Sequence, residues 1–171
     1  MPHLSSIRDV FAHQRIVSIV REGFRKPKPG GCELAFLEEL KAHGIPTGAY
    51  NLPDWEETAE GFNLLLENLF KSTPPTALII DEIFWFIAAV VFLARRRIRV
   101  PEEVSLVSGD CEIVLDMCHP RFARMSWDNR LIVRRVVRWV NGVRKGRADR
   151  KTLNIPAEFF PGGSIGPVWT P

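Results

Sequence analysis

The chain has 171 residues, of which 46% are apolar and 25% are charged. This composition suits one globular domain and excludes disordered, collagen-like and low-complexity chains. The longest apolar run, Ile83 to Ala94, falls short of the roughly 20 residues of a membrane span and indicates a buried helix. The start, MPHLSSIRD, lacks a cationic segment followed by an apolar one, so no signal peptide is expected. Three irregularly spaced cysteines suit a reducing compartment, so a cytoplasmic protein is expected.

The net charge of +3 is unevenly distributed along the chain. Residues 1–120 carry 12 basic and 17 acidic side chains, whereas residues 121–171 carry 11 basic and 3 acidic ones. A basic region of this kind can contact nucleic acid. It can also be the solvated face of one helix, which is the more frequent case. The charge distribution alone does not choose between them.

Short β-branched runs alternate with helical patterns, which is typical of an α/β fold with a parallel sheet flanked by helices. We expect strands at 15–20, 76–80 and 104–107, helices at 33–43, 56–71, 83–97 and 130–143, a short helix near residues 7–11, and a short strand in the last twenty residues. The Pro- and Gly-rich segment 21–31 predicts a loop. Gly44 is expected to cap the helix before it, and Asp128 or Asn129 the last one.

The last expected helix is amphipathic. Its apolar stripe consists of Val133, Val136, Val137 and Val140, and four arginines lie on the other side: Arg130, Arg134, Arg135 and Arg138. If this stripe is left exposed, it is an association surface. The sequence therefore predicts a homodimer or an exchange of segments between copies.

The cysteines offer weak candidate sites. Cys111, Cys118 and His119 are zinc-type ligands, but they lack the close spacing of a zinc knuckle, and no metal site is predicted. Cys32 could be a nucleophile at a helix N-terminus, where the dipole lowers a thiol pKa. No histidine partner is recognisable for it, and the glycine-rich nucleotide-binding patterns are absent. No cofactor is predicted, and the chain is not expected to be an enzyme.

Acidic side chains at strand ends are stronger candidates. Asp81 and Glu82 follow one expected strand, and Asp110 follows the next. In parallel sheets ligands bind beyond the carboxyl ends of the strands. Acids there can accept hydrogen bonds from ligand hydroxyls, or they can cap the following helix. Trp55 can stack on a sugar ring or a base, or it can belong to the core.

Two segments, PTALIIDE and RIRVPEEVSLVSGDCE, resemble the effector-binding domain of the lactose/purine repressor family of bacterial transcription regulators. In that family a strand that begins Pro-Thr-Ala leads to a helix, then to a Val-Pro-Glu-Asp-Val-Ser segment and a strand that ends in Gly-x-Asp-Asp. Further segments follow the family pattern in order: AHQRI, AFLEELKAHGIP, FARMSWDN and FFPGGSIGP. The resemblance covers nearly the whole chain.

The resemblance implies a type I periplasmic-binding-protein fold, mainly its C-terminal lobe. Residues 1–121 would form this lobe, 122–146 a crossover strand and helix of the N-terminal lobe, and 147–171 a return strand and tail. The family's helix-turn-helix has no counterpart here, so DNA would be a partner only through a domain missing from these residues. The resemblance implies a small-molecule effector as the partner, most simply a sugar. It implies no contact with a membrane. A periplasmic sugar-binding protein and a small α/β enzyme using Cys32 or Cys111 stay as alternatives.

Site residues carry over unevenly. Asp110 matches the family acid that binds hydroxyl or ring N–H groups, and Trp55 falls where some members place an aromatic ring over the ligand. Glu82 holds the polar position at the helix start, with Asp81 as its alternative. Cys32 falls near the family's ligand-clamping arginine.

Trp127 lies in the crossover, where a polar hinge contact is common. Loss of a bidentate guanidinium at Cys32 is expected to change the ligand class or weaken binding. Cys111 also replaces a second acid of the family pattern. These departures predict an altered effector.

Overall fold

The computed structural model describes residues 13–111, 113–147, 150–152 and 154–168. Its centre is a five-stranded sheet whose strands lie in chain order, with the first four parallel and the last antiparallel to its neighbour. The strands are β1 (Ile16–Ile19), β2 (Ala77–Ile80), β3 (Ser105–Ser108), β4 (Ala123–Trp127) and β5 (Ala157–Phe160). The expected parallel α/β sheet is confirmed. The helix expected near residues 7–11 lies outside the described residues.

The helices are α2 (Glu22–Arg25), α3 (Gly31–Ala42), α4 (Ala59–Ser72), α5 (Ile83–Arg95) and α6 (Asn129–Arg144), with a 3₁₀ turn at Ile113–Asp116. The helical spacing in the sequence predicts the four long helices. Gly44 follows α3 with a φ of 71°, as expected for a glycine that ends a helix. Helix α2 lies in the segment expected to be a loop, because tertiary contacts from Arg25 hold it against the end of β1.

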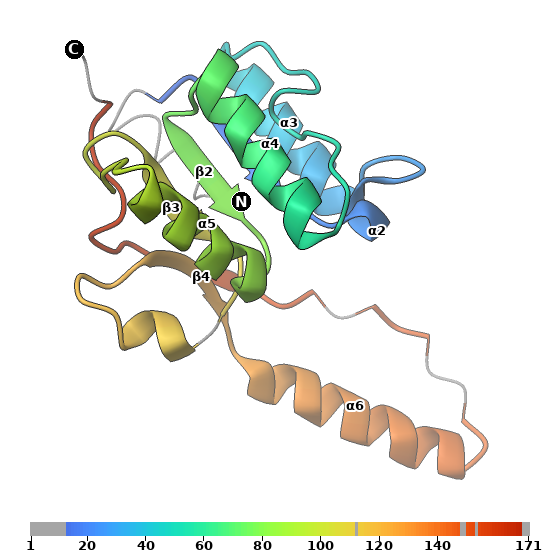
Figure 1. The fold of residues 1–171 in the computed structure, drawn as a ribbon. Coiled ribbons are helices and arrows are strands. Elements are labelled where there is room, and N and C mark those ends of the chain that lie inside the picture. The colour runs from blue at the N-terminus through green and yellow to red at the C-terminus, as the bar shows by residue number, and fades with distance from the viewer. Residues whose placement is uncertain (1–12, 112, 148–149, 153, 169–171) are drawn as a thin grey trace.

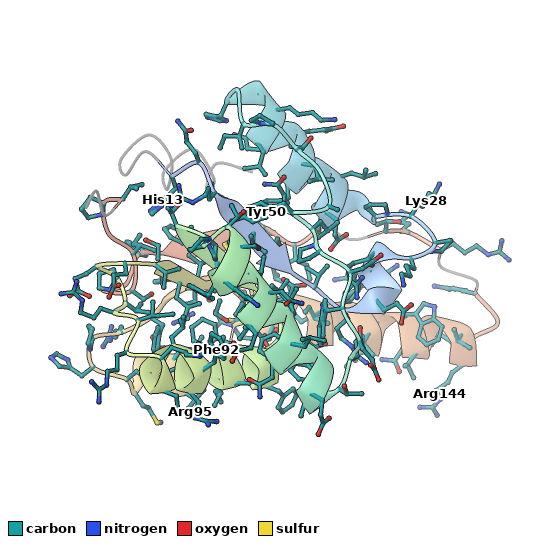
Figure 2. The ribbon with its side chains drawn as sticks, turned by 45° about the horizontal axis from the view of Figure 1, so that its top comes forward. His13, Lys28, Tyr50, Phe92, Arg95 and Arg144 are labelled. Atoms are coloured by element: carbon teal, nitrogen blue, oxygen red, sulfur yellow. The ribbon has the colours of Figure 1, made fainter. Side chains whose placement is uncertain are left out.

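Helices cover both faces of the sheet. On one face α4 and α5 pack over side chains that alternate along the first three strands: Val17, Ile19, Leu78, Ile80 and Leu106. Phe70 of α4 and Phe92 of α5 lie 5.9 Å apart, measured between ring centroids. Figure 2 labels Phe92 among the side chains of the protein. On the other face Phe36 and Leu40 of α3 pack on Ile16. Both faces of the parallel strands are therefore buried, which is why their sequences are continuously apolar.

Helix α6 stands away from this body, as Figure 1 shows. None of its residues is buried. The expected apolar stripe is exposed, with exposed fractions of 42–60%: Val133, Val136, Val137 and Val140. Asp128 caps the helix as expected, and its carboxylate accepts a hydrogen bond from the Arg130 N–H at 2.9 Å.

The strand before α6 continues the sheet, because β4 pairs with β3 through Ala123 and Arg124. The assignment of residues 122–146 to a second lobe stays a prediction. The pairing of β5 with β4 then closes the sheet edge. Only α6 and the return segment project from the lobe (Figure 1). In the described part of the chain, no helix is long and apolar enough to cross a membrane.

Candidate functional site

The carboxyl ends of β1, β2 and β3 meet at one edge of the sheet. There the Asp81 N–H donates to the Ile19 carbonyl at 3.2 Å, and the Gly109 N–H donates to the Ile80 carbonyl at 2.8 Å. Each bond joins the residue after one strand to the end of its neighbour. The register therefore brings together two of the expected site residues, Asp81 and Asp110.

Asp81 lies directly against Gly109. A side chain on Gly109 would collide with Asp81 Oδ1, so the glycine makes room for the carboxyl group. Burial raises the pKa of Asp81 to about 6, and the nearby carboxyl groups of Glu33, Asp110 and Glu82 add to that shift. Among the described residues no hydrogen bond to this carboxyl group is formed. Perturbed acids at such an edge are typical of ligand sites, although structural networks also produce them.

Asp110 begins a tight turn. Its Oδ1 accepts the Cys111 N–H at 2.8 Å, and its own N–H donates to Ser108 Oγ at 3.1 Å. Cys111 Sγ lies 3.2 Å from Ser126 Oγ and 3.8 Å from the carbonyl oxygen of Trp127. The end of β3 is thus tied to the end of β4. Trp127 is half-buried next to this turn.

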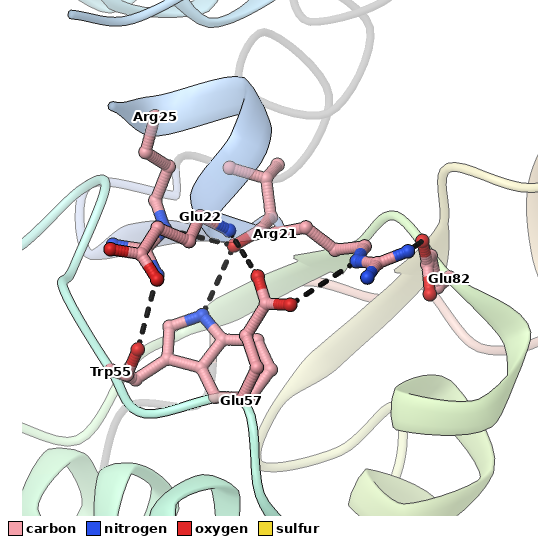
Figure 3. A network of polar contacts seen from close by, with 7 residues as sticks. Arg21, Glu22, Arg25, Trp55, Glu57 and Glu82 are labelled. Carbon is pink, nitrogen blue, oxygen red and sulfur yellow. Dashed lines mark hydrogen bonds and ion pairs between the residues drawn. The ribbon is translucent and has the colours of Figure 1, made fainter. Parts of the chain in front are cut away.

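Trp55 is held by three contacts. Its ring centroid lies 5.4 Å from that of Phe62 and 4.9 Å from that of Trp85, both in edge-to-face geometry. Its Nε1–H donates to the Val20 carbonyl at 3.0 Å (Figure 3). The residue is half-buried and packs against the hydrophobic core, which agrees with the core alternative for Trp55. Stacking on a ligand ring stays a prediction.

Two arginines that the sequence interpretation missed lie beside this tryptophan. Arg25 is buried and pairs with Asp54, and it donates to the carbonyl oxygens of Val20 at 3.0 Å and Trp55 at 3.1 Å. Its role is to hold α2 and the Trp55 loop together. The sequence of segment 21–31 is typical of a loop. The short helix α2 within it depends on the buried side chain of Arg25, which local sequence patterns do not predict.

Arg21 bridges two elements at the same edge. It donates to Glu57 at 3.2 Å and to Glu82 at 3.3 Å (Figure 3). The Glu22 backbone N–H, together with the Arg21 guanidinium, lowers the pKa of Glu57. Glu82 is therefore already paired with a cation, whereas Asp81 is not. Of the two alternatives for the acid after β2, Asp81 has the carboxyl group without a partner of opposite charge.

Cys32 is exposed on the first turn of α3. The next residue, Glu33, is buried, with 7% of its surface exposed. In the sequence Cys32 is a candidate site residue and Glu33 is not, because an acid in the first turn of a helix is ordinary. In the described part of the chain, no group of three Cys, His, Asp or Glu residues is arranged to hold a metal ion.

One cavity lies away from these residues. It has a volume of about 820 Å³ and is lined by residues that precede the strands, among them Arg15, Thr76 and Glu103. It therefore opens at the amino edge of the sheet.

Residues 11–165 match the family of periplasmic binding protein-like domains. The chain belongs to this family. A comparison with curated proteins gave no match. Solved structures with the same fold are transcriptional regulators of the LacI family, which confirms the resemblance to lactose-repressor-type regulators at the level of the fold.

One such regulator, from Bifidobacterium animalis subsp. lactis, has 21% identity and a TM-score of 0.75 over 96% of this chain and 60% of its own. The regulator CelR, solved with cellobiose, has 20% identity and a TM-score of 0.75 over 94% of this chain and 49% of its own. A regulator from Arthrobacter sp. FB24, solved with lactose, has 17% identity and a TM-score of 0.73 over 95% of this chain and 61% of its own. This periplasmic binding protein-like chain thus spans half to three fifths of these regulators.

Proposed function

We propose that this chain is the effector-binding part of a cytoplasmic LacI-type transcriptional regulator. A small polyhydroxylated molecule would bind at the carboxyl edge of the sheet. The observation that carries the proposal is the pair of acids, Asp81 and Asp110, at adjacent strand ends of a periplasmic binding protein-like lobe. Carboxylates accept hydrogen bonds from hydroxyl groups, and the two regulators solved with cellobiose and lactose support a sugar-like ligand.

In this mechanism the carboxyl edge of the sheet is one half of the ligand-binding site. Asp110 and Asp81 bind hydroxyl groups, Trp55 stacks on the ring, and the backbone turn at Asp110 keeps the acid in place. A second lobe would close over the ligand and shift a DNA-binding domain between two states. DNA is contacted through that domain and not through these residues. The chain carries no catalytic role in this proposal.

The test is a thermal-shift screen against pentoses, hexoses, sugar acids and purines at millimolar concentration. A ligand at 100 times its dissociation constant stabilises the folded state by about 2.7 kcal/mol, which moves the melting temperature by a few degrees. A selective response that Asp110→Ala abolishes supports the proposal. Glu38→Gln, on the exposed side of α3, is the control that must keep the response. A flat panel refutes the proposed ligand site.

The homodimer remains a prediction that depends on α6. Its exposed valines would pack against those of a second copy, with the arginines on the solvent side. Light scattering over a range of concentrations measures the association directly. A monomer at high concentration contradicts it.

The alternative to an effector-binding domain is a small α/β enzyme that uses a cysteine as its nucleophile. Cys111 is the better placed thiol, because it lies beside Ser126 at the carboxyl edge. Iodoacetamide alkylation as a function of pH distinguishes the two proposals. A thiol that reacts with an apparent pKa well below about 8.5 favours the enzyme, and ordinary reactivity removes it.

A further inference from the structure

The cavity at the amino edge of the sheet has the size of a small-molecule site. Its volume is about 820 Å³, and small-molecule sites usually measure about 300–1,000 Å³. Its wall is formed by residues that precede the strands and by the C-terminal ends of α4 and α5. It lies at the edge opposite to the proposed effector site, so its lining can be considered on its own.

Two acids line this cavity, and both are already paired with arginines. Glu67 of α4 forms an ion pair with Arg96, which follows α5. Glu103 accepts from Arg99 Nε at 2.9 Å, and the Arg99 backbone N–H donates to the same carboxylate at 3.0 Å. The negative charge in the wall is therefore neutralised within the chain.

Arg15 is held in place with part of its guanidinium group unused. Its Nε–H donates to the Pro74 carbonyl at 2.6 Å, and its own carbonyl accepts the Thr76 N–H at 2.8 Å. Within the part of the chain that the structure describes, its two Nη groups form no hydrogen bond and no ion pair. A guanidinium fixed through Nε can still offer Nη donors to two oxygens of one carboxylate or phosphate.

Lys71 adds a second cation to the same wall. It lies in the last turn of α4, lines the cavity and forms no ion pair among the described residues. A cation in the last turn is favoured by the helix dipole, which accounts for Lys71 without a ligand. Arg15 precedes a strand, so the dipole does not account for it. Two unpaired cations from different elements therefore converge on one cavity.

The rest of the wall is largely apolar. Phe70 of α4 packs against the core beside Phe92, and Ile98 follows α5. Two consecutive prolines, Pro74 and Pro75, complete this side of the cavity. Apolar side chains of this kind contact a ring or an alkyl group, whereas the cations fix its charged end.

We propose that this cavity binds a small organic oxyanion, a carboxylate or a phosphate ester on an apolar body. Arg15 and Lys71 bind the oxygen atoms, and Phe70 and Ile98 contact the apolar body. This site is separate from the carboxyl edge, so the proposal goes beyond the proposed function and does not depend on it.

Matched ligand pairs test the charge and the apolar body separately. Isothermal titration at pH 7.5 compares phenylacetate with phenylacetamide, and phenyl phosphate with inorganic phosphate. A carboxylic acid with a pKa near about 4 is ionised there. We expect phenylacetate to bind at least ~10-fold more tightly than its amide, as one charge-assisted hydrogen bond allows. Phenyl phosphate should bind more tightly than inorganic phosphate, and its affinity relative to phenylacetate identifies the preferred head group.

Substitutions of the two cations locate the binding. Arg15→Gln and Lys71→Gln should each weaken phenylacetate binding at least ~5-fold and leave phenylacetamide unchanged, because only the charged contact is lost. Lys41→Gln is the control, since it removes the same charge from the last turn of α3, on the other face of the sheet. Asp110→Ala should also leave phenylacetate binding unchanged. If Arg15→Gln does not fold, the exposed Lys71→Gln carries the test.

The outcomes separate this cavity from the proposed effector site. Equal binding of phenylacetate and phenylacetamide, or no binding of either anion at millimolar concentration, overturns the oxyanion site and leaves the proposed function standing. An anion preference that survives both Arg15→Gln and Lys71→Gln overturns the assignment to this cavity. Loss of phenylacetate binding in Asp110→Ala also overturns that assignment, because the anion would then bind at the carboxyl edge.

Discussion

Replacing Asp81 by asparagine is expected to stabilise the protein at pH 7.5. The Asp81 carboxyl group lies against Gly109 without a hydrogen bond from any described residue, and burial with nearby acids raises its pKa from 3.8 to about 6. That difference is roughly two pH units, and each unit corresponds to about 1.36 kcal/mol. The charged form in the folded state therefore costs about 3 kcal/mol relative to an unperturbed acid. Asparagine has nearly the same shape and carries no charge.

The sign of the pH dependence follows from the raised pKa. Stability that Asp81 contributes is fully present below its unfolded value of 3.8 and is lost as the pH rises through about 6. The advantage of Asp81→Asn over the unmodified chain should thus be about 3 kcal/mol at pH 7.5 and shrink toward zero near pH 4. The advantage changes by about 1.36 kcal/mol per pH unit between pH 3.8 and about 6, and it is constant above that range.

Urea unfolding followed by circular dichroism at several pH values measures this difference. Glu38→Gln is the control, and an exposed substitution of this kind should change stability by less than about 0.5 kcal/mol at every pH. An Asp81→Asn protein that is no more stable than the unmodified chain at pH 7.5 refutes the assignment of a buried, unpaired carboxyl group. A constant advantage that does not vary with pH refutes the electrostatic origin.

The remaining predictions concern the core, the sheet and α6. Burial lowers the pKa of His13, so the stability that His13 contributes is fully present above pH 6.5 and is lost as the pH falls. In the Asp81→Asn background, the free energy of unfolding measured with urea should therefore decline from pH 7 to pH 5. The further substitution His13→Gln should flatten that decline. Leu66 is fully buried in α4, so Leu66→Ala should cost about 2–5 kcal/mol in the same assay, and a smaller loss would contradict its place in the core. Val137→Asp on α6 should abolish association in light scattering without lowering the melting temperature, whereas a fall in stability would mean that this face packs within one chain.

The periodicity of the sequence predicts the local structure well. The apolar runs at β1, β2 and β3 are continuous because helices bury both faces of these strands. The helical spacing in α3, α4 and α5 follows the core contacts of each helix. Helix α6 has the same signal and yet none of its residues is buried, because amphipathicity shows which face can be buried and not what covers it.

Part of the site could also be foreseen. Acids that follow parallel strands must lie at one edge of the sheet, so Asp81 and Asp110 were accessible from the sequence. The preference for Asp81 over Glu82 was not, because it depends on Arg21 reaching Glu82 across the gap between two elements. Such a pairing depends on the positions of distant residues and leaves no periodic trace.

By itself the sequence determined the parallel sheet, the order of its elements along the chain and the sheet edge at which the acids after the strands meet, because these follow from local patterns and from chain direction. Only the tertiary structure decided which side chains are buried and which charges are paired. Glu33 and Cys32 are neighbours on the first turn of α3, but Glu33 is buried and Cys32 is exposed. Burial and pairing depend on what other segments bring to the same place, and this is the physical reason that neither could be inferred from the order of residues.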